Sequence, residues 1–65
     1  VLGPGVVIAP GAVINRGTHI GADSQVWASA LIERDAVLGV RVVVLAGAVV
    51  PREAVIPDGA VVGSN

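Results

Sequence analysis

Branched aliphatic residues recur at every sixth position along this chain, with no residue inserted or lost between them. They are Leu2, Ile8, Ile14, Ile20, Val26, Ile32, Leu38, Val44, Val50, Ile56 and Val62. A fixed internal period is the signature of a repeat architecture built from stacked units. We therefore take this column as the first position of a hexapeptide and predict that it forms the core.

Two further positions of the hexapeptide are restricted. The fifth carries small or β-branched residues, namely Val6, Ala12, Thr18, Ser24, Ala30, Ala36, Val42, Ala48, Ala54 and Ala60. The fourth is glycine in half of the repeats, at Gly5, Gly11, Gly17, Gly47 and Gly59. Glycine fits backbone conformations that other residues find costly, so it indicates a turn. Each unit is predicted to be a short strand, alternating between core and solvent, followed by a two-residue turn.

This period predicts a triangular prism. A helix needs apolar spacing near 3.6 residues, which a period of six does not supply. Three short strands with turns of the same sense make a coil of 18 residues that rises by about 4.8 Å, one strand spacing. Side chains 18 residues apart, such as Ile14, Ile32 and Val50, then stack. We predict an all-β, single-stranded parallel β-helix of about three and a half coils as one domain, residues 1–65.

Folding the repeat into a prism leaves one outward face without charge. The predicted interface residues are Val7, Trp27, Leu31, Val43, Leu45 and Val61. A contiguous apolar patch of this kind usually marks an interface with another chain. The alternative is a face covered by a helix or domain outside this sequence. Because solenoids normally need capping and no cap is evident, we expect the chain to be a segment of a longer one.

Charge gathers at one corner of the predicted prism, where Arg16, Arg34 and Arg52 stack 18 residues apart. Guanidinium groups bind phosphate oxygens well, so this column is a candidate site for a phosphate-bearing small-molecule substrate. Its acidic neighbours are Glu33, Asp35 and Glu53. The alternative interpretation is a solvated corner whose charges these neighbours neutralise.

Composition excludes several classes of protein. The 65 residues carry a net charge of −1, one aromatic side chain and no cysteine. Without an excess of positive charge, no basic surface for nucleic acid is predicted. Without cysteine, neither a cysteine-based zinc site nor a disulfide scaffold can form. The sequence contains no uninterrupted run of about 18 apolar residues, so it predicts no membrane span. A basic start followed by an apolar stretch, as in a signal peptide, is also missing, so we expect a cytoplasmic protein.

The pattern aliphatic–Gly–x–x–small–x resembles the hexapeptide-repeat acyltransferase superfamily of left-handed parallel β-helices, over the whole chain. The resemblance implies a left-handed coil and a homotrimer packed through prism faces. It also implies transfer of an acyl group, typically acetyl, from acyl-CoA to a hydroxyl or amine of a sugar or small metabolite. Acetyl-CoA or another acyl-CoA would be the co-substrate, with no metal.

Members of this superfamily use a histidine as general base in a groove between subunits. The stretch Ile32–Gly39 is similar to a segment in which sugar acetyltransferases carry that histidine, and Arg34 stands at its place here. Arginine cannot lose its proton at working pH. His19, the single imidazole, is the remaining candidate base, with Asn15 or Asp35 to orient it. The alternative is a surface histidine without a role.

A second, weaker resemblance is to γ-class carbonic anhydrase-like proteins. Trp27, Ala30 and Asp35 match their Trp-x-x-Ala-x-x-Arg-Gly-Asp stretch. A catalytic zinc in that family needs three histidines, and this chain has one, so no metal site is expected. The alternative function is a non-catalytic module for oligomerisation or regulation. Such a module could be a sugar-nucleotidyltransferase tail, a metal-free carbonic anhydrase-like protein or an engineered repeat scaffold.

Overall fold

The structure is a computed structural model that describes residues 2–63; residues 1, 64 and 65 of the predicted domain lie outside it. Its ten strands are β1 (Val7–Ile8), β2 (Val13–Ile14), β3 (His19–Ile20), β4 (Gln25–Val26), β5 (Leu31–Ile32), β6 (Val37–Leu38), β7 (Val43–Val44), β8 (Val49–Val50), β9 (Val55–Ile56) and β10 (Val61–Val62). Each strand starts six residues after the previous one, as predicted. The described residues include no helix able to cross a membrane.

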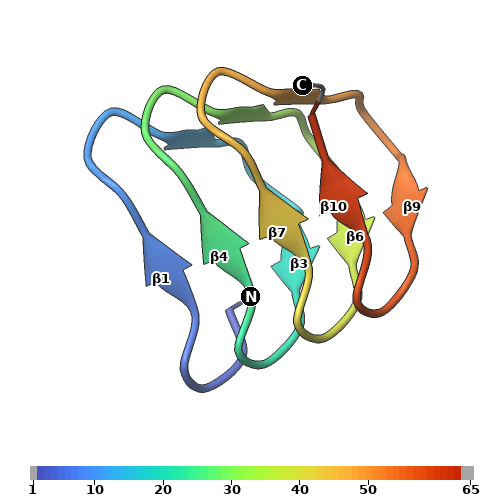
Figure 1. Ribbon diagram of the computed structural model, residues 1–65. Coiled ribbons are helices and arrows are strands. Elements are labelled where there is room, and N and C mark those ends of the chain that lie inside the picture. The colour runs from blue at the N-terminus through green and yellow to red at the C-terminus, as the bar shows by residue number, and fades with distance from the viewer. Residues whose placement is uncertain (1, 64–65) are drawn as a thin grey trace.

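The strands form three parallel sheets, one on each face of a prism. The first face is β1-β4-β7-β10, the second β2-β5-β8 and the third β3-β6-β9. Figure 1 shows the chain passing from face to face as a left-handed coil that advances by one strand per lap. Every paired residue lies 18 positions from its partner, so that Ile14 aligns with Ile32 and Ile32 with Val50. The parallel β-helix predicted from the period is confirmed.

The first-position aliphatics form the core inside the prism. Those of the middle coils are buried: Ile20, Val26, Ile32, Leu38, Val44 and Val50. Their counterparts in the outer coils are less covered, and Leu2 is 51% exposed because only one side of its coil is packed. Full burial of one such side chain stabilises the folded state by about 1.5–3 kcal/mol. The stacked column is therefore the main source of stability.

Two fifth-position residues, Ser24 and Thr18, are polar and buried, and the hydroxyl group of each is hydrogen-bonded. The Ser24 hydroxyl donates to the Gly39 carbonyl oxygen at 3.0 Å and accepts from the Val42 N–H at 3.1 Å. The Thr18 hydroxyl lies 2.9 Å from the carbonyl oxygen of Asn15. A buried hydroxyl is tolerated when it is hydrogen-bonded, as both are here. The Ser24 bonds join neighbouring coils, whereas the bond from Thr18 to Asn15 closes its own turn. Neither follows from a periodic signal in the sequence.

Within residues 2–63, every fourth-position residue adopts a positive φ, which confirms the predicted turn. The glycines Gly5, Gly11, Gly17, Gly47 and Gly59 have φ between 73° and 83°. The other five, Asp23, Ser29, Asp35, Arg41 and Glu53, have φ between 54° and 62°. This conformation costs an ordinary residue about 1–2 kcal/mol. The stacking of the coils therefore imposes the turn even where glycine is absent.

Glycines at the second position of the third face serve a different purpose. A Cβ added to Gly21 would lie 2.6 Å from the carbonyl carbon of Gly39, and one added to Gly3 would lie 2.8 Å from the Ala22 nitrogen. Real Cβ atoms do not come this close to backbone. Gly21, with Gly3 and Gly39 in the same column, therefore allows neighbouring coils to meet closely along this edge.

These two glycine roles predict different costs of substitution. Gly47→Ala places a Cβ in open space at φ 73°, so we expect a loss of about 1 kcal/mol from the backbone alone. Gly21→Ala forces the Gly39 backbone away, so we expect roughly 2–3 kcal/mol. Urea unfolding followed by circular dichroism measures both. Equal losses, or a larger loss for Gly47→Ala, would contradict the close-approach role.

Candidate functional site

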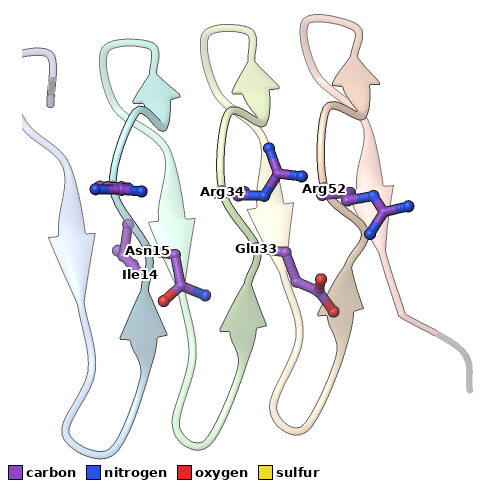
Figure 2. A pocket seen from close by; sticks show the side chains of 6 residues that line it. Ile14, Asn15, Glu33, Arg34 and Arg52 are labelled. Atoms are coloured by element: carbon purple, nitrogen blue, oxygen red, sulfur yellow. The ribbon is translucent and has the colours of Figure 1, made fainter.

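The stacked turns at residues 16–17, 34–35 and 52–53 form a charged edge between the second and third faces, here named the arginine corner. Arg16, Arg34 and Arg52 each come two residues after the end of a strand of the second face. Because those strands pair in register, the three arginines fall in one column, as predicted. With Ile14, Asn15 and Glu33 they line an open pocket, which Figure 2 shows along the prism edge.

The ion pairs at this corner concentrate on its middle arginine. Arg34 Nη1 donates to Asp35 Oδ2 at 3.1 Å and lies 3.8 Å from Glu53 Oε2. Within residues 2–63, neither Arg16 nor Arg52 forms an ion pair. Two guanidinium groups on the same exposed edge are thus left to attract an anion. The neutralised-corner interpretation holds for Arg34 alone.

The wall of the pocket nearer the second face carries an amide and a carboxylate. Asn15 Nδ2 donates to the carbonyl oxygen of Ile32 at 3.2 Å, which fixes the amide across two coils. Glu33 is half-buried, and Figure 2 shows its carboxylate extending beside the arginine column. A negative group at this wall repels part of an anionic ligand. The pocket thus places guanidinium groups next to an amide and a carboxylate that can form hydrogen bonds.

His19 lies on the third face at the start of β3, exposed to solvent. Its side chain forms no hydrogen bond with any described residue. The two residues expected to orient it are engaged elsewhere, since the Asn15 amide binds Ile32 and the Asp35 carboxylate binds Arg34. The structure therefore does not assemble a base and its orienting group within residues 2–63. In that range it also brings together no group of three or more acidic, His or Cys side chains that could hold a metal.

The uncharged first face has a shallow apolar pocket lined by Val7, Ala9, Gln25, Val26 and Trp27. Five of the six predicted interface residues lie on this face; Leu31 lies in β5 on the second face. Trp27 is 49% and Val61 61% exposed. Apolar exposure is not unique to the first face, because Val55 on the third is 75% exposed. Its distinguishing features are the single tryptophan and the uncharged corner that follows it, residues 10–11, 28–29 and 46–47.

Comparison with known protein families identifies the class to which this fold belongs. The family model described as bacterial transferase hexapeptide (six repeats) matches residues 1–34, which is more than half of the 65-residue chain. The chain belongs to the hexapeptide-repeat family. Searches of curated proteins and of solved structures gave no significant match. The superfamily expected from the repeat is thereby confirmed.

The exposure of the arginine corner predicts a small structural contribution from its ion pairs. The side chains of Arg34 and Asp35 are 48% and 52% exposed, and such pairs contribute about 0–1 kcal/mol. Arg34→Ala should therefore lower the free energy of unfolding by less than about 1 kcal/mol. Ile32→Ala, two residues away but fully buried, should lower it by about 2–5 kcal/mol. Chemical denaturation compares the two, and a large loss for Arg34→Ala would give this corner a structural role.

Proposed function

We propose that the protein is an acyltransferase that moves an acyl group, typically acetyl, from acyl-CoA to a hydroxyl or amine of a sugar or small metabolite. Two findings support this proposal. The chain belongs to a family described as bacterial transferases. Its surface also carries an open pocket with a column of arginines, suited to the phosphate groups of the donor.

The observation that carries the proposal is the pair of guanidinium groups without ion-pair partners in the described structure, Arg16 and Arg52. They flank Arg34 at the same edge, one coil below and one coil above it. A guanidinium group can bind two phosphate oxygens at once through parallel N–H donors. Because both side chains are exposed, water and salt weaken each contact, so binding is expected to depend on ionic strength.

For the chemical step, the proposal assigns the general base to His19. A neutral imidazole can take the proton of an attacking hydroxyl near neutral pH, whereas Arg34 cannot. The side-chain nitrogens of His19 are without hydrogen bonds to described residues. In a homotrimer, a neighbouring subunit would supply the group that orients the His19 imidazole. The acceptor would bind in the groove between the two subunits.

If the arginine corner binds the acyl-CoA donor, removing one of its unpaired charges should weaken the affinity for acetyl-CoA. Calorimetric titration with acetyl-CoA should show binding to the native protein and a roughly tenfold weaker Kd for Arg52→Ala, equal to about 1.4 kcal/mol. Arg41→Gly is the matched control, because it removes one positive charge from another corner and relieves a positive φ. Its Kd should equal that of the native protein. Equal affinity for all three proteins would remove the arginine corner as the donor site.

The trimer part predicts that the first face holds the subunits together. Trp27→Lys places a charge on this face and should dissociate the trimer while leaving circular dichroism unchanged. Val55→Lys changes a more exposed apolar residue on the third face and should keep the native sedimentation coefficient. If Val55→Lys dissociates the protein and Trp27→Lys does not, the subunits pack through the other face.

A non-catalytic module for oligomerisation or regulation is the second candidate function. It is favoured by Arg34, which stands where related acetyltransferases carry their histidine and is paired with Asp35. The isolated position of His19 favours it as well. A ligand that binds the folded state raises the melting temperature by mass action. No shift with excess acetyl-CoA, and no release of free CoA thiol when sugars are added, would favour the module.

A further inference from the structure

One turn at the corner between the third and first faces carries Asp58 followed by Gly59, and both residues are exposed. An aspartate is followed directly by glycine at this one place in the sequence. The next backbone nitrogen reaches an aspartate carboxyl group most easily in this pair, because glycine has no side chain and turns freely. The pair is therefore the place in this chain where the backbone can rearrange through an aspartate side chain.

The rearrangement needs no reactant other than water. The Gly59 nitrogen forms a bond to Cγ of the protonated Asp58 carboxyl group, and the N–H proton leaves with the carboxyl hydroxyl as water. The product is a five-membered succinimide. Water then adds to the former backbone carbonyl carbon of Asp58, the original peptide bond to Gly59 breaks, and the chain continues through Cγ as isoaspartate. The mass of the protein is unchanged, but its backbone is one carbon longer.

The structure holds both reacting groups on one residue of the preceding coil, Val40. The Val40 N–H donates to Asp58 Oδ1 at 2.9 Å, and the Gly59 N–H donates to the Val40 carbonyl oxygen at 2.9 Å. Gly39 leaves room for this arrangement, because a Cβ there would overlap Asp58 Oδ1. While both bonds last, the nitrogen keeps its proton and the carboxyl group stays on Val40.

The bond to the carboxylate is not a feature of the repeat. Val40 stands at the third position of its hexapeptide, and within residues 2–63 no other third-position N–H forms a hydrogen bond. The bond from Gly59 to Val40, by contrast, recurs at other turns, such as that from Glu53 to Arg34. The Asp58 carboxylate thus adds a specific bond at the one turn where the backbone nitrogen can attack it.

We propose that Asp58–Gly59 is a site of isoaspartate formation that the fold keeps closed, and that it reacts only when its turn separates from the turn at residues 40–41. Separation frees the carboxyl group and the Gly59 N–H together. The added backbone carbon then stands in a chain whose stacking needs a fixed number of residues per lap. Isoaspartate at residue 58 therefore marks past opening of this turn and prevents the same pairing with Val40. This inference is independent of the proposed acyl transfer.

Incubation of the folded protein and of the protein unfolded in guanidinium chloride, both at neutral pH, measures how far the fold protects the site. Peptide mapping by mass spectrometry and methylation by an isoaspartyl methyltransferase quantify isoaspartate at residue 58. We expect it to form at least about tenfold more slowly in the folded protein, which corresponds to roughly one hydrogen bond that must first be broken. Equal rates in the two samples overturn the proposal.

Two substitutions at residue 40 separate the carboxylate bond from the rest of the turn. Val40→Pro removes the N–H that binds Asp58 and keeps the carbonyl that binds Gly59; Gly3–Pro4 already places a proline after a glycine in this column. Val40→Ala keeps both bonds and is the matched control. In the folded state, isoaspartate should form roughly fivefold to tenfold faster in Val40→Pro than in the native protein, and at the native rate in Val40→Ala. A folded Val40→Pro with the native rate overturns the proposal, and so does an equal rise in Val40→Ala.

The native protein supplies the test if Val40→Pro fails to fold by circular dichroism. Hydrogen exchange of the Gly59 N–H reports separation of its turn from Val40. In a series of guanidinium chloride concentrations below the unfolding transition, isoaspartate formation should rise in proportion to this exchange. A proportional rise supports the closed site. Isoaspartate formation that does not follow the exchange of Gly59 overturns it.

Discussion

The structure depends on one constraint, the stacking of first-position aliphatics at intervals of 18 residues. Each strand is two residues long and has no stability of its own. Its hydrogen bonds run to the coils above and below, and its core residue is covered by the counterparts one lap away, as Ile32 is by Ile14 and Val50. A shift of one residue in register would turn every later core side chain from the interior of the prism to its solvent side. Register, rather than local preference for strands, therefore holds the fold together.

The surface features follow from the same register. A column of like residues arises wherever the chain repeats a residue type every 18 positions, and the arginine corner is such a column. Stacked like charges repel, so the column needs acidic neighbours, yet the ion pairs collect on Arg34. The outer arginines keep their charge available because no acid in the described structure reaches them. A repeating scaffold thus produces a charged groove without any dedicated loop.

The repeat was enough to predict the sheets, the core column, the turns and the alignment of the three arginines. It could not predict which arginine pairs with Asp35, because that depends on side-chain conformations around a finished corner. The hydrogen bonds of Ser24 and the close approach at Gly21 were missed for a related reason. Both arise from distances between coils, which a one-dimensional period does not contain. Leu31, which the predicted interface includes, lies on the second face, where the period places it.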